Sequence, residues 1–385
     1  MRAAAIVLAI AGCSYDPSVA TTDAVPRTDG AETDGFAGSI DVAHLGPDEE
    51  VKLTGTAVWT IDADLTIDTE TGAIDPPPPA GVVVIPSALQ QNGGPAVMVI
   101  QAATIEVTVQ VDVTGTRPLI FVATDTFTLS DTSIDVSAAG SKSGPGGSLG
   151  GMGPGAGTPG TRDVAADGGA GGASYGNTLP GGRGGAGGGG ATGGAPGIAY
   201  GGPNLLQGGS GGGAGSSGNT TCASPGGVGG GALQITAPII VGTAGALINA
   251  GGGGGDGGAD CADDGPSGAG GGSGGMIFLD APMLTGTMKL FALGGGGGEG
   301  GDTDGSPAGD AGDDAGIQPG VAGNGDTNGG NGGRGAGITA AEPGKVPETG
   351  DSDGNGGGGG GGVGRIYYRH SLSNPFIATP PADAG

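Results

Sequence analysis

The sequence LQITAPIIVGT at residues 233–243 recurs as IFLDAPMLTGT at residues 277–287, with apolar and small residues in the same places. Each copy is followed by a short apolar segment, then by five glycines and one acidic residue: GGGGGD at 251–256 and GGGGGE at 294–299. The offset is 44 residues at the Ala-Pro pair and 43 at the glycine run. A repeat of this length is typical of stacked structural units, because one such unit cannot bury its apolar face alone.

Apolar and polar residues also alternate upstream of this pair, as they do in half-buried strands. The alternation is strictest over residues 105–113, IEVTVQVDV, where the many β-branched residues disfavour a helix. It returns at residues 117–140 and, in part, at 365–370. We interpret both stretches as further copies of the repeat.

Without its glycines, each copy is about 20 residues long and holds two or three short strands, the size of one coil of a parallel β-helix. We therefore predict an all-β fold, a parallel β-helix or β-solenoid whose coils carry long glycine-rich loop insertions. The alternative is an antiparallel β-sandwich with glycine-rich loops. The solenoid requires these residues to stack: Leu233 on Ile277, Ile235 on Leu279, and Ala237 on Ala281, with Ala123 continuing the column.

The composition limits both the core and the partners. Glycine supplies 100 of 385 residues, proline 27, and aromatic residues only 3%, so an apolar core can form only where the strand-like runs gather. The formal net charge is −26, which repels phosphate backbones, and we expect no nucleic-acid partner. The acids either keep a glycine-rich surface soluble, which we favour, or bind cations.

The N-terminus resembles a bacterial lipoprotein signal peptide. After a short basic start, residues 3–11 form an apolar run too short to span a bilayer but of the length found in secretion signals. The run ends in LAIAGC at residues 8–13, which resembles a lipobox. By this resemblance, the lipoprotein signal peptidase cuts after Gly12, Cys13 carries the lipid, and Ser14 directs the protein to the outer membrane. Several acyl chains together anchor a protein stably.

Composition shifts divide the chain into segments. Thr, Asp, Ala, Pro and Gly dominate the stretch after Cys13, without periodicity, which predicts a disordered tether. The expected segments are a lipoprotein signal peptide at 1–12, the tether at 13–50, an N-terminal β region at 51–140, a glycine-rich insertion at 141–231, two β repeats at 232–293 with a glycine-rich loop at 251–275, an acidic glycine-rich insertion at 294–362, and a terminal strand and tail at 363–385.

The glycine-rich insertions allow two structures. Glycine loses the most backbone entropy on ordering, which favours disorder. Packed polyglycine helices of the polyproline-II kind are the alternative, with three residues per turn and hydrogen bonds to neighbouring segments. GGRGGAG at residues 181–187 suits such packing, because only small residues fit between close backbones. In composition these segments resemble the glycine-rich bundles of some phage-tail adhesins and receptor ectodomains.

Two cysteines remain after the proposed lipid site. Cys222 and Cys261 lie in successive glycine-rich segments, 39 residues apart, close to the repeat length. Outside the cytoplasm we expect them to form a disulfide. Neither has a CxxC partner or a nearby histidine, so zinc is not expected.

The sequence holds no recognisable catalytic constellation. It contains only two histidines, His44 and His370, and no nucleophile elbow, P-loop or zinc-protease motif. Acids on the predicted strands are Asp112, Asp135 and Asp280, and no two of them occupy the same place in the repeat. We therefore expect no enzymatic activity. The alternative is a polysaccharide lyase or hydrolase, which would need two carboxylates on adjacent coils.

Calcium is a secondary hypothesis, and we expect no other cofactor. Residues 251–256 resemble the start of the calcium-binding nonapeptide repeat of secreted toxins, but Gly258 stands where a hydrophobic residue should follow. A loose cluster of acids further on could supply oxygen ligands, although a solvated acidic loop is the simpler interpretation. These candidate ligands are Asp302, Asp304, Asp310, Asp313 and Asp314.

The lipobox, the repeats and the absent catalytic motifs together resemble the glycine-rich exported lipoproteins of some Gram-negative bacteria. This resemblance implies a lipid-anchored protein of the outer membrane, facing the periplasm or the cell surface, with a structural, adhesive or cell-envelope role. Its partners would be the membrane itself and cell-envelope polysaccharide or other surface proteins. A carbohydrate-active β-helix enzyme and a calcium-dependent adhesion module are the alternatives.

Overall fold

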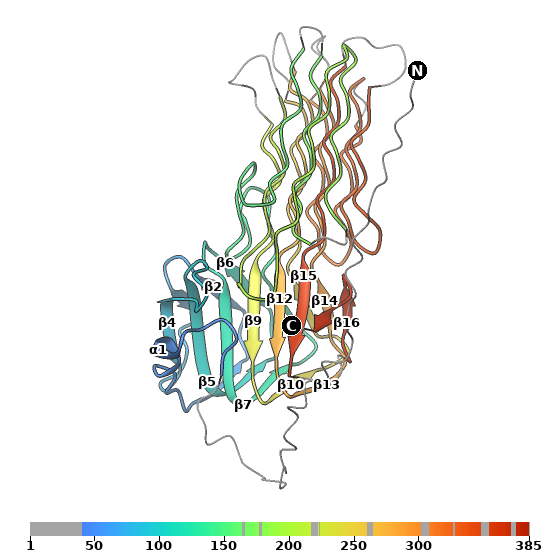
Figure 1. Ribbon diagram of the computed structural model, residues 1–385. Helices are drawn as coiled ribbons and strands as arrows, with labels where there is room; N and C mark the ends of the chain where they lie inside the picture. Colours follow the sequence, from blue (N-terminus) through green and yellow to red (C-terminus); the bar gives the residue numbers. More distant parts are fainter. Residues whose placement is uncertain are drawn as a thin grey trace, which may run out of the picture. The chain divides into compact units, whose positions relative to one another are not determined.

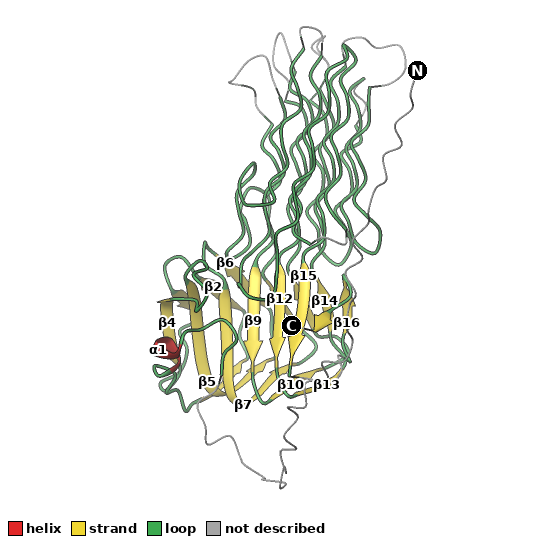
Figure 2. Ribbon diagram, in the orientation of Figure 1, coloured by secondary structure: helices red, strands yellow, loops and turns green. Residues whose placement is uncertain are grey.

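The computed structural model describes residues 41–163, 166–176, 179–216, 222, 224–259, 265–301, 308–325, 328–347, 354–370 and 375–384. Its contacts divide the chain into two units, Met1–Ala37 and Gly38–Gly385, and the description below concerns the second. Strands and loops make up almost all of the described residues, with one four-residue helix, α1 (Pro47–Glu50) (Figure 2). Within these residues there is no helix that is both long and apolar enough to cross a membrane.

The described strands form two sheets (Figure 1). The larger sheet contains β1 (Val58–Ile61), β4 (Val83–Ala88), β5 (Val97–Val107), β7 (Leu119–Leu129), β9 (Ala232–Thr236), β10 (Ile239–Gly242), β12 (Met276–Asp280), β13 (Met283–Gly286), β15 (Arg365–Arg369) and β17 (Asp383–Ala384). The smaller sheet contains β2 (Leu65–Asp68), β3 (Ala73–Asp75), β6 (Val111–Thr114), β8 (Ser133–Asp135), β11 (Leu247–Asn249), β14 (Lys289–Phe291) and β16 (Ile377–Thr379).

Strand pairing is parallel in both sheets, apart from two antiparallel pairs, β4 with β5 and β2 with β3. Taken in sequence order, β9, β10 and β11 pair with β12, β13 and β14. An all-β, largely parallel arrangement is therefore confirmed, and the antiparallel sandwich is wrong. The described strands do not close into one continuous wall, because no ladder joins the larger sheet to the smaller one.

The repeat that opens the sequence sets the register of the larger sheet. Leu233 pairs with Ile277 and Ile235 pairs with Leu279, as predicted from the 44-residue offset. Leu119 continues this column on the other side of Leu233. All of these side chains are fully buried in one core that both sheets fill, and Ala123, Ala237 and Ala281 belong to the same core. Burying each large aliphatic side chain contributes about 1.5–3 kcal/mol.

The end of the expected tether is ordered. From Asp41 onward the chain packs on the outer face of the larger sheet, where Val42 and Leu45 join a second core with Phe278 and Tyr367. The prediction of a disordered segment up to residue 50 is therefore wrong for residues 41–50. Its apolar side chains in this core are Val42, Ala43 and Leu45, too few to give a periodic signal in the sequence.

The glycine-rich segments have no ladder pairing, but their backbones are hydrogen-bonded throughout the described parts. In residues 169–174 successive N–H groups donate to three different neighbouring segments, and the cycle then repeats. The donor and acceptor pairs are Gly169 to Gly185, Ala170 to Gly268, Gly171 to Thr158, Gly172 to Gly182, Ala173 to Gly271, and Ser174 to Gly155. A cycle of three residues is the period of the polyproline-II helix. For the described residues the disordered alternative is wrong, and the packed-helix alternative agrees with the structure.

Residues 354–364 lie at the centre of this glycine bundle, by which we mean the described parts of 144–231, 251–275 and 294–364. The N–H groups of residues 356–362 donate to segments 167–173, 295–298 and 342–345. Their carbonyl groups accept from three other segments, 182–188, 268–274 and 330–336. The central segment thus has six hydrogen-bonded neighbours. In Figure 1 the segments of the bundle run side by side away from one end of β9, β12 and β15.

Close backbone contact explains why the central segment is almost pure glycine. At every position from 356 to 361, an added Cβ atom would come within 3.0 Å of a neighbouring carbonyl oxygen. Real Cβ atoms essentially never approach so closely, so alanine there would push two segments apart. The first non-glycine residues beyond this run, Asn355 and Val363, are themselves fully buried.

We predict that Gly359→Ala destabilises the protein by at least about 1–3 kcal/mol, because its methyl group would collide with the backbone of Gly182. Gly316→Ala is the matched control, since an added Cβ there meets nothing within 4 Å. It should leave stability unchanged or raise it by about 0.4–1 kcal/mol, through the lower entropy of the unfolded chain. Thermal and denaturant unfolding would measure both effects. Equal stability of the two variants would contradict the close packing of the bundle.

Candidate functional site

Two aspartates and an asparagine lie side by side on the outer face of the smaller sheet, and we call them the acidic row. Asp112 of β6 pairs in register with Asp135 of β8, and Asp135 pairs in turn with Asn249 of β11. Neighbouring strands lie about 4.8 Å apart, so the two carboxylates are direct neighbours on adjacent strands. The prediction that no two strand acids share a position is therefore wrong. That prediction assumed the 43–44-residue offset, whereas β6 and β8 are not separated by a glycine-rich insertion.

Each of these carboxylates keeps one oxygen without a hydrogen bond to the described residues. Asp112 accepts a bond from the Gln110 side-chain amide at 2.7 Å. Asp135 accepts from the backbone N–H of Ser137 at 2.9 Å and from the Asn249 amide at 3.4 Å, again through Oδ1. Asp112 is exposed and Asp135 half-buried, so both can reach a ligand on this face.

A hollow of about 320 Å³ adjoins the acidic row. Thr114, which follows Asp112 on the same exposed face of β6, lines it. Asp68 and Lys142 also contribute to its wall. A hydrogen bond from the Thr71 hydroxyl holds the pKa of Asp68 below its usual value, so this carboxylate is ionised at neutral pH.

A second polar cluster lies on the opposite, outer face of the larger sheet, around the buried carboxylate of Asp280. Arg369 binds it with two nitrogens, Nε at 2.9 Å and Nη2 at 2.8 Å. His370 approaches through Nδ1 at 3.0 Å, and the Thr236 hydroxyl donates at 3.4 Å. Arg369 also contacts Asp41. Because both oxygens of Asp280 are engaged, the carboxylate serves as the anchor of this cluster.

His44 extends the cluster towards the bundle. Its Nδ1 lies 2.5 Å from the Gln234 side chain and its Nε2 lies 2.9 Å from the carbonyl oxygen of Pro203. The ring packs edge-on against Phe278. Burial lowers the pKa of His44, and this effect outweighs the hydrogen bonds, which act in the opposite direction. The imidazole is therefore neutral at pH 7 and holds the docked N-terminal stretch on the sheet.

Sequence reasoning missed this cluster because its members are far apart in the chain. His44 falls within the predicted tether and His370 within the predicted terminal strand, and only Asp280 is predicted as an acid on a strand. The bonds from His44 to Gln234 and from His370 to Asp280 span 190 and 90 residues. No spacing in the sequence could have revealed them.

The predicted covalent sites lie largely beyond what the structure describes. Cys13 and Cys261 are outside the described residues. Cys222 is disulfide-bonded. The pairing of Cys222 with Cys261 stays a prediction.

The candidate calcium ligands are not gathered into a site within the described parts of the chain. Asp302 and Asp304 lie outside those parts. Among the described residues, no three His, Cys, Asp or Glu side chains come together in a way that could hold a metal ion. Asp314 instead accepts hydrogen bonds from the backbone of Gly140 and Gly254, which ties the bundle to the strands.

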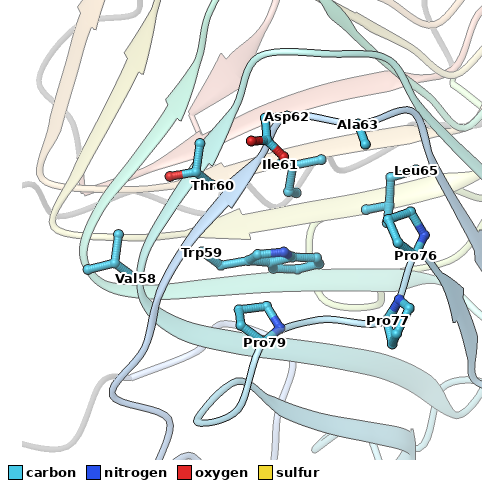
Figure 3. A pocket seen from close by; sticks show the side chains of 10 residues that line it. All are labelled: Val58, Trp59, Thr60, Ile61, Asp62, Ala63, Leu65, Pro76, Pro77 and Pro79. Carbon is cyan, nitrogen blue, oxygen red and sulfur yellow. The ribbon is translucent and has the colours of Figure 1, made fainter.

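One further pocket lies beside β1 and has a volume of about 380 Å³ (Figure 3). All four residues of β1 line it, together with the segment around Asp62 and with Pro76, Pro77 and Pro79. Figure 3 shows the Trp59 ring lying across the middle of the group, between Pro79 and Ile61. Neither histidine nor any of the predicted site residues belongs to this pocket.

Comparison of the chain with protein-family models, with curated proteins and with solved structures found no match. Its function must therefore be argued from its own residues.

Proposed function

We propose that the strands form the coils of an open-walled β-solenoid and that each glycine-rich segment is inserted between one coil and the next. The triplet β9, β10, β11 pairs with β12, β13, β14 in the same order, which supports successive coils. The insertions leave the strands at equivalent points, after β8, after β11 and after β14. A common exit point lets segments from three parts of the chain pack into one bundle.

We further propose that the protein is a lipid-anchored component of the outer membrane with a structural or adhesive role. The observation that carries this proposal is the bundle itself, in which the central segment is hydrogen-bonded to six neighbours. At about 3.1 Å per residue, its eleven residues extend roughly 34 Å. An ordered rod of this kind supports an extended surface or a spacer, which fits a cell-envelope protein.

The surface of the bundle is suited to contact with other molecules. Side chains recur at every third residue on its exposed segments, as in Thr192, Ala195 and Ile198, because the positions between them face neighbouring backbones. Thr158 and Thr161 on the adjoining segment bond to this one through their hydroxyls. The result is a regular array of exposed side chains, which favours a binding or coating surface over a catalytic cleft.

The anchor can be tested by labelling cells with radioactive palmitate. The wild-type protein should incorporate label and Cys13→Ser should not, because the proposed lipid is attached to that sulfur. Cys222→Ser removes a cysteine elsewhere and should still be labelled. Absence of label from the wild type, or equal labelling of Cys13→Ser, would contradict the proposal.

The acidic row on the smaller sheet favours one second candidate, a carbohydrate-active enzyme. Two carboxyl groups about 5–5.5 Å apart are the arrangement that retaining glycosidases use, and the in-register pairing of Asp112 with Asp135 supports a separation of that order. In this hypothesis one carboxylate attacks the sugar and the other protonates the leaving oxygen.

A screen for release of reducing ends from cell-envelope polysaccharides would test this second candidate. If the wild type is active, Asp112→Asn and Asp135→Asn should each lower kcat about 10²–10⁴-fold, the usual contribution of one acid or base. Asp125→Asn, an exposed strand acid away from the row, should keep full activity. An inactive wild type, or an equal loss in all three variants, would exclude the hypothesis.

A further inference from the structure

The strand β1 has an uncovered edge. Among the described strands it pairs only with β5, so one of its two edges has no partner strand. The nearby strands β5 and β2 each have an antiparallel partner, β4 for β5 and β3 for β2. The carbonyl groups of Ala57 and Ile61 accept bonds from the β5 side. Because backbone groups alternate along a strand, the N–H and C=O groups of Val58 and Thr60 face away from β5. No described residue bonds to them.

The pocket in Figure 3 lies along this strand, and its opposite wall consists of prolines. Proline has no N–H to donate, so Pro76, Pro77 and Pro79 cannot complete a ladder with β1. The wall is tied to the strand only at its start, where Thr56 and Ala57 donate to the carbonyl of Gly81. A slot of about 380 Å³ therefore stays open beside a strand edge.

Trp59 adds a donor without an acceptor to this slot. It is the only tryptophan in the chain, and its side chain is 5% exposed. The indole N–H makes no hydrogen bond to any residue that the structure describes. This nitrogen is not among the buried polar atoms that lack a partner, so it is open to solvent and can donate to an acceptor that a ligand supplies.

The surroundings of the slot carry negative charge. Asp62 lines the pocket and Asp64 follows it on the same turn, both exposed. Glu106 lies next to Thr60 in the register of β1 and β5. No lysine or arginine lines the pocket. The slot therefore suits a ligand that carries positive charge.

We propose that β1 binds an extended peptide segment of a partner protein, rich in lysine or arginine, which adds to the sheet as a further strand. Two free N–H and two free C=O groups at alternate residues match the backbone of a strand, as in β-strand addition elsewhere. A sugar could accept from the indole but would not match that alternation. A second copy of this chain is disfavoured, because each copy carries a net charge of −26. This inference does not depend on the lipid anchor.

Titration of the full-length chain with short peptides, followed by the fluorescence of Trp59, tests the proposal. A capped peptide alternating lysine and valine should produce a saturable change, weakened by added salt, and one alternating glutamate and valine should not. Thr60→Pro should weaken binding of the lysine peptide at least tenfold, because it removes one outward N–H while leaving the ladder to β5 intact. Thr60→Val keeps the N–H and should bind like the wild type.

A charge reversal provides an independent check if Thr60→Pro proves unfolded by circular dichroism. Asp62→Lys should weaken binding of the lysine peptide and allow the glutamate peptide to bind. The proposal is overturned if no saturable binding occurs, if Thr60→Pro binds as well as the wild type, or if the glutamate peptide binds the wild type equally. Self-association of the chain that Thr60→Pro abolishes would likewise overturn it, since a second copy would then occupy the slot.

Discussion

The glycine bundle depends on the backbone hydrogen bonds of its central segment, residues 354–364. Each of its N–H groups from 356 to 362 finds a carbonyl on one of three neighbours, and three more neighbours donate to it. An intramolecular hydrogen bond contributes about 0.5–1.5 kcal/mol, while ordering one residue's backbone costs about 1–2 kcal/mol, and more for glycine. These magnitudes nearly cancel. The bundle therefore has little stability of its own and needs a folded base.

The stacked strands supply that base, because their ladders continue into the bundle without a break. Val136, just past β8, donates to Asn249, and Ala138 donates to Gly251. Ala250 then donates to Phe291 at the end of β14, and Gly252 donates to Leu293 just beyond it. Segments from distant parts of the sequence thus leave the sheets already in parallel register. Burial of the apolar core stabilises the strands, and the strands in turn hold the glycine segments in an order that they could not maintain alone.

The sequence allowed the stacking of equivalent strands in the repeat to be predicted. It did not reveal the contacts between residues outside the repeat or those between segments of the bundle. Leu233 and Ile277 could be paired because their repeat is written out in full, whereas Asp112 and Asp135 were missed because the earlier copies lack the glycine insertion and follow a shorter offset. Docking of Val42 and His44 rests on packing across the fold. The sequence cannot show which glycine segments lie next to each other, because glycine has no side chain that would distinguish one neighbour from another.

Amide hydrogen exchange across the central segment tests the account most directly. Peptides covering residues 354–364 should exchange about as slowly as those covering β9 and β12, because their N–H groups are bonded and enclosed by neighbours. Exchange there at the rate of an unfolded chain, with β9 and β12 still protected, would contradict the ordered bundle on which the proposed function rests.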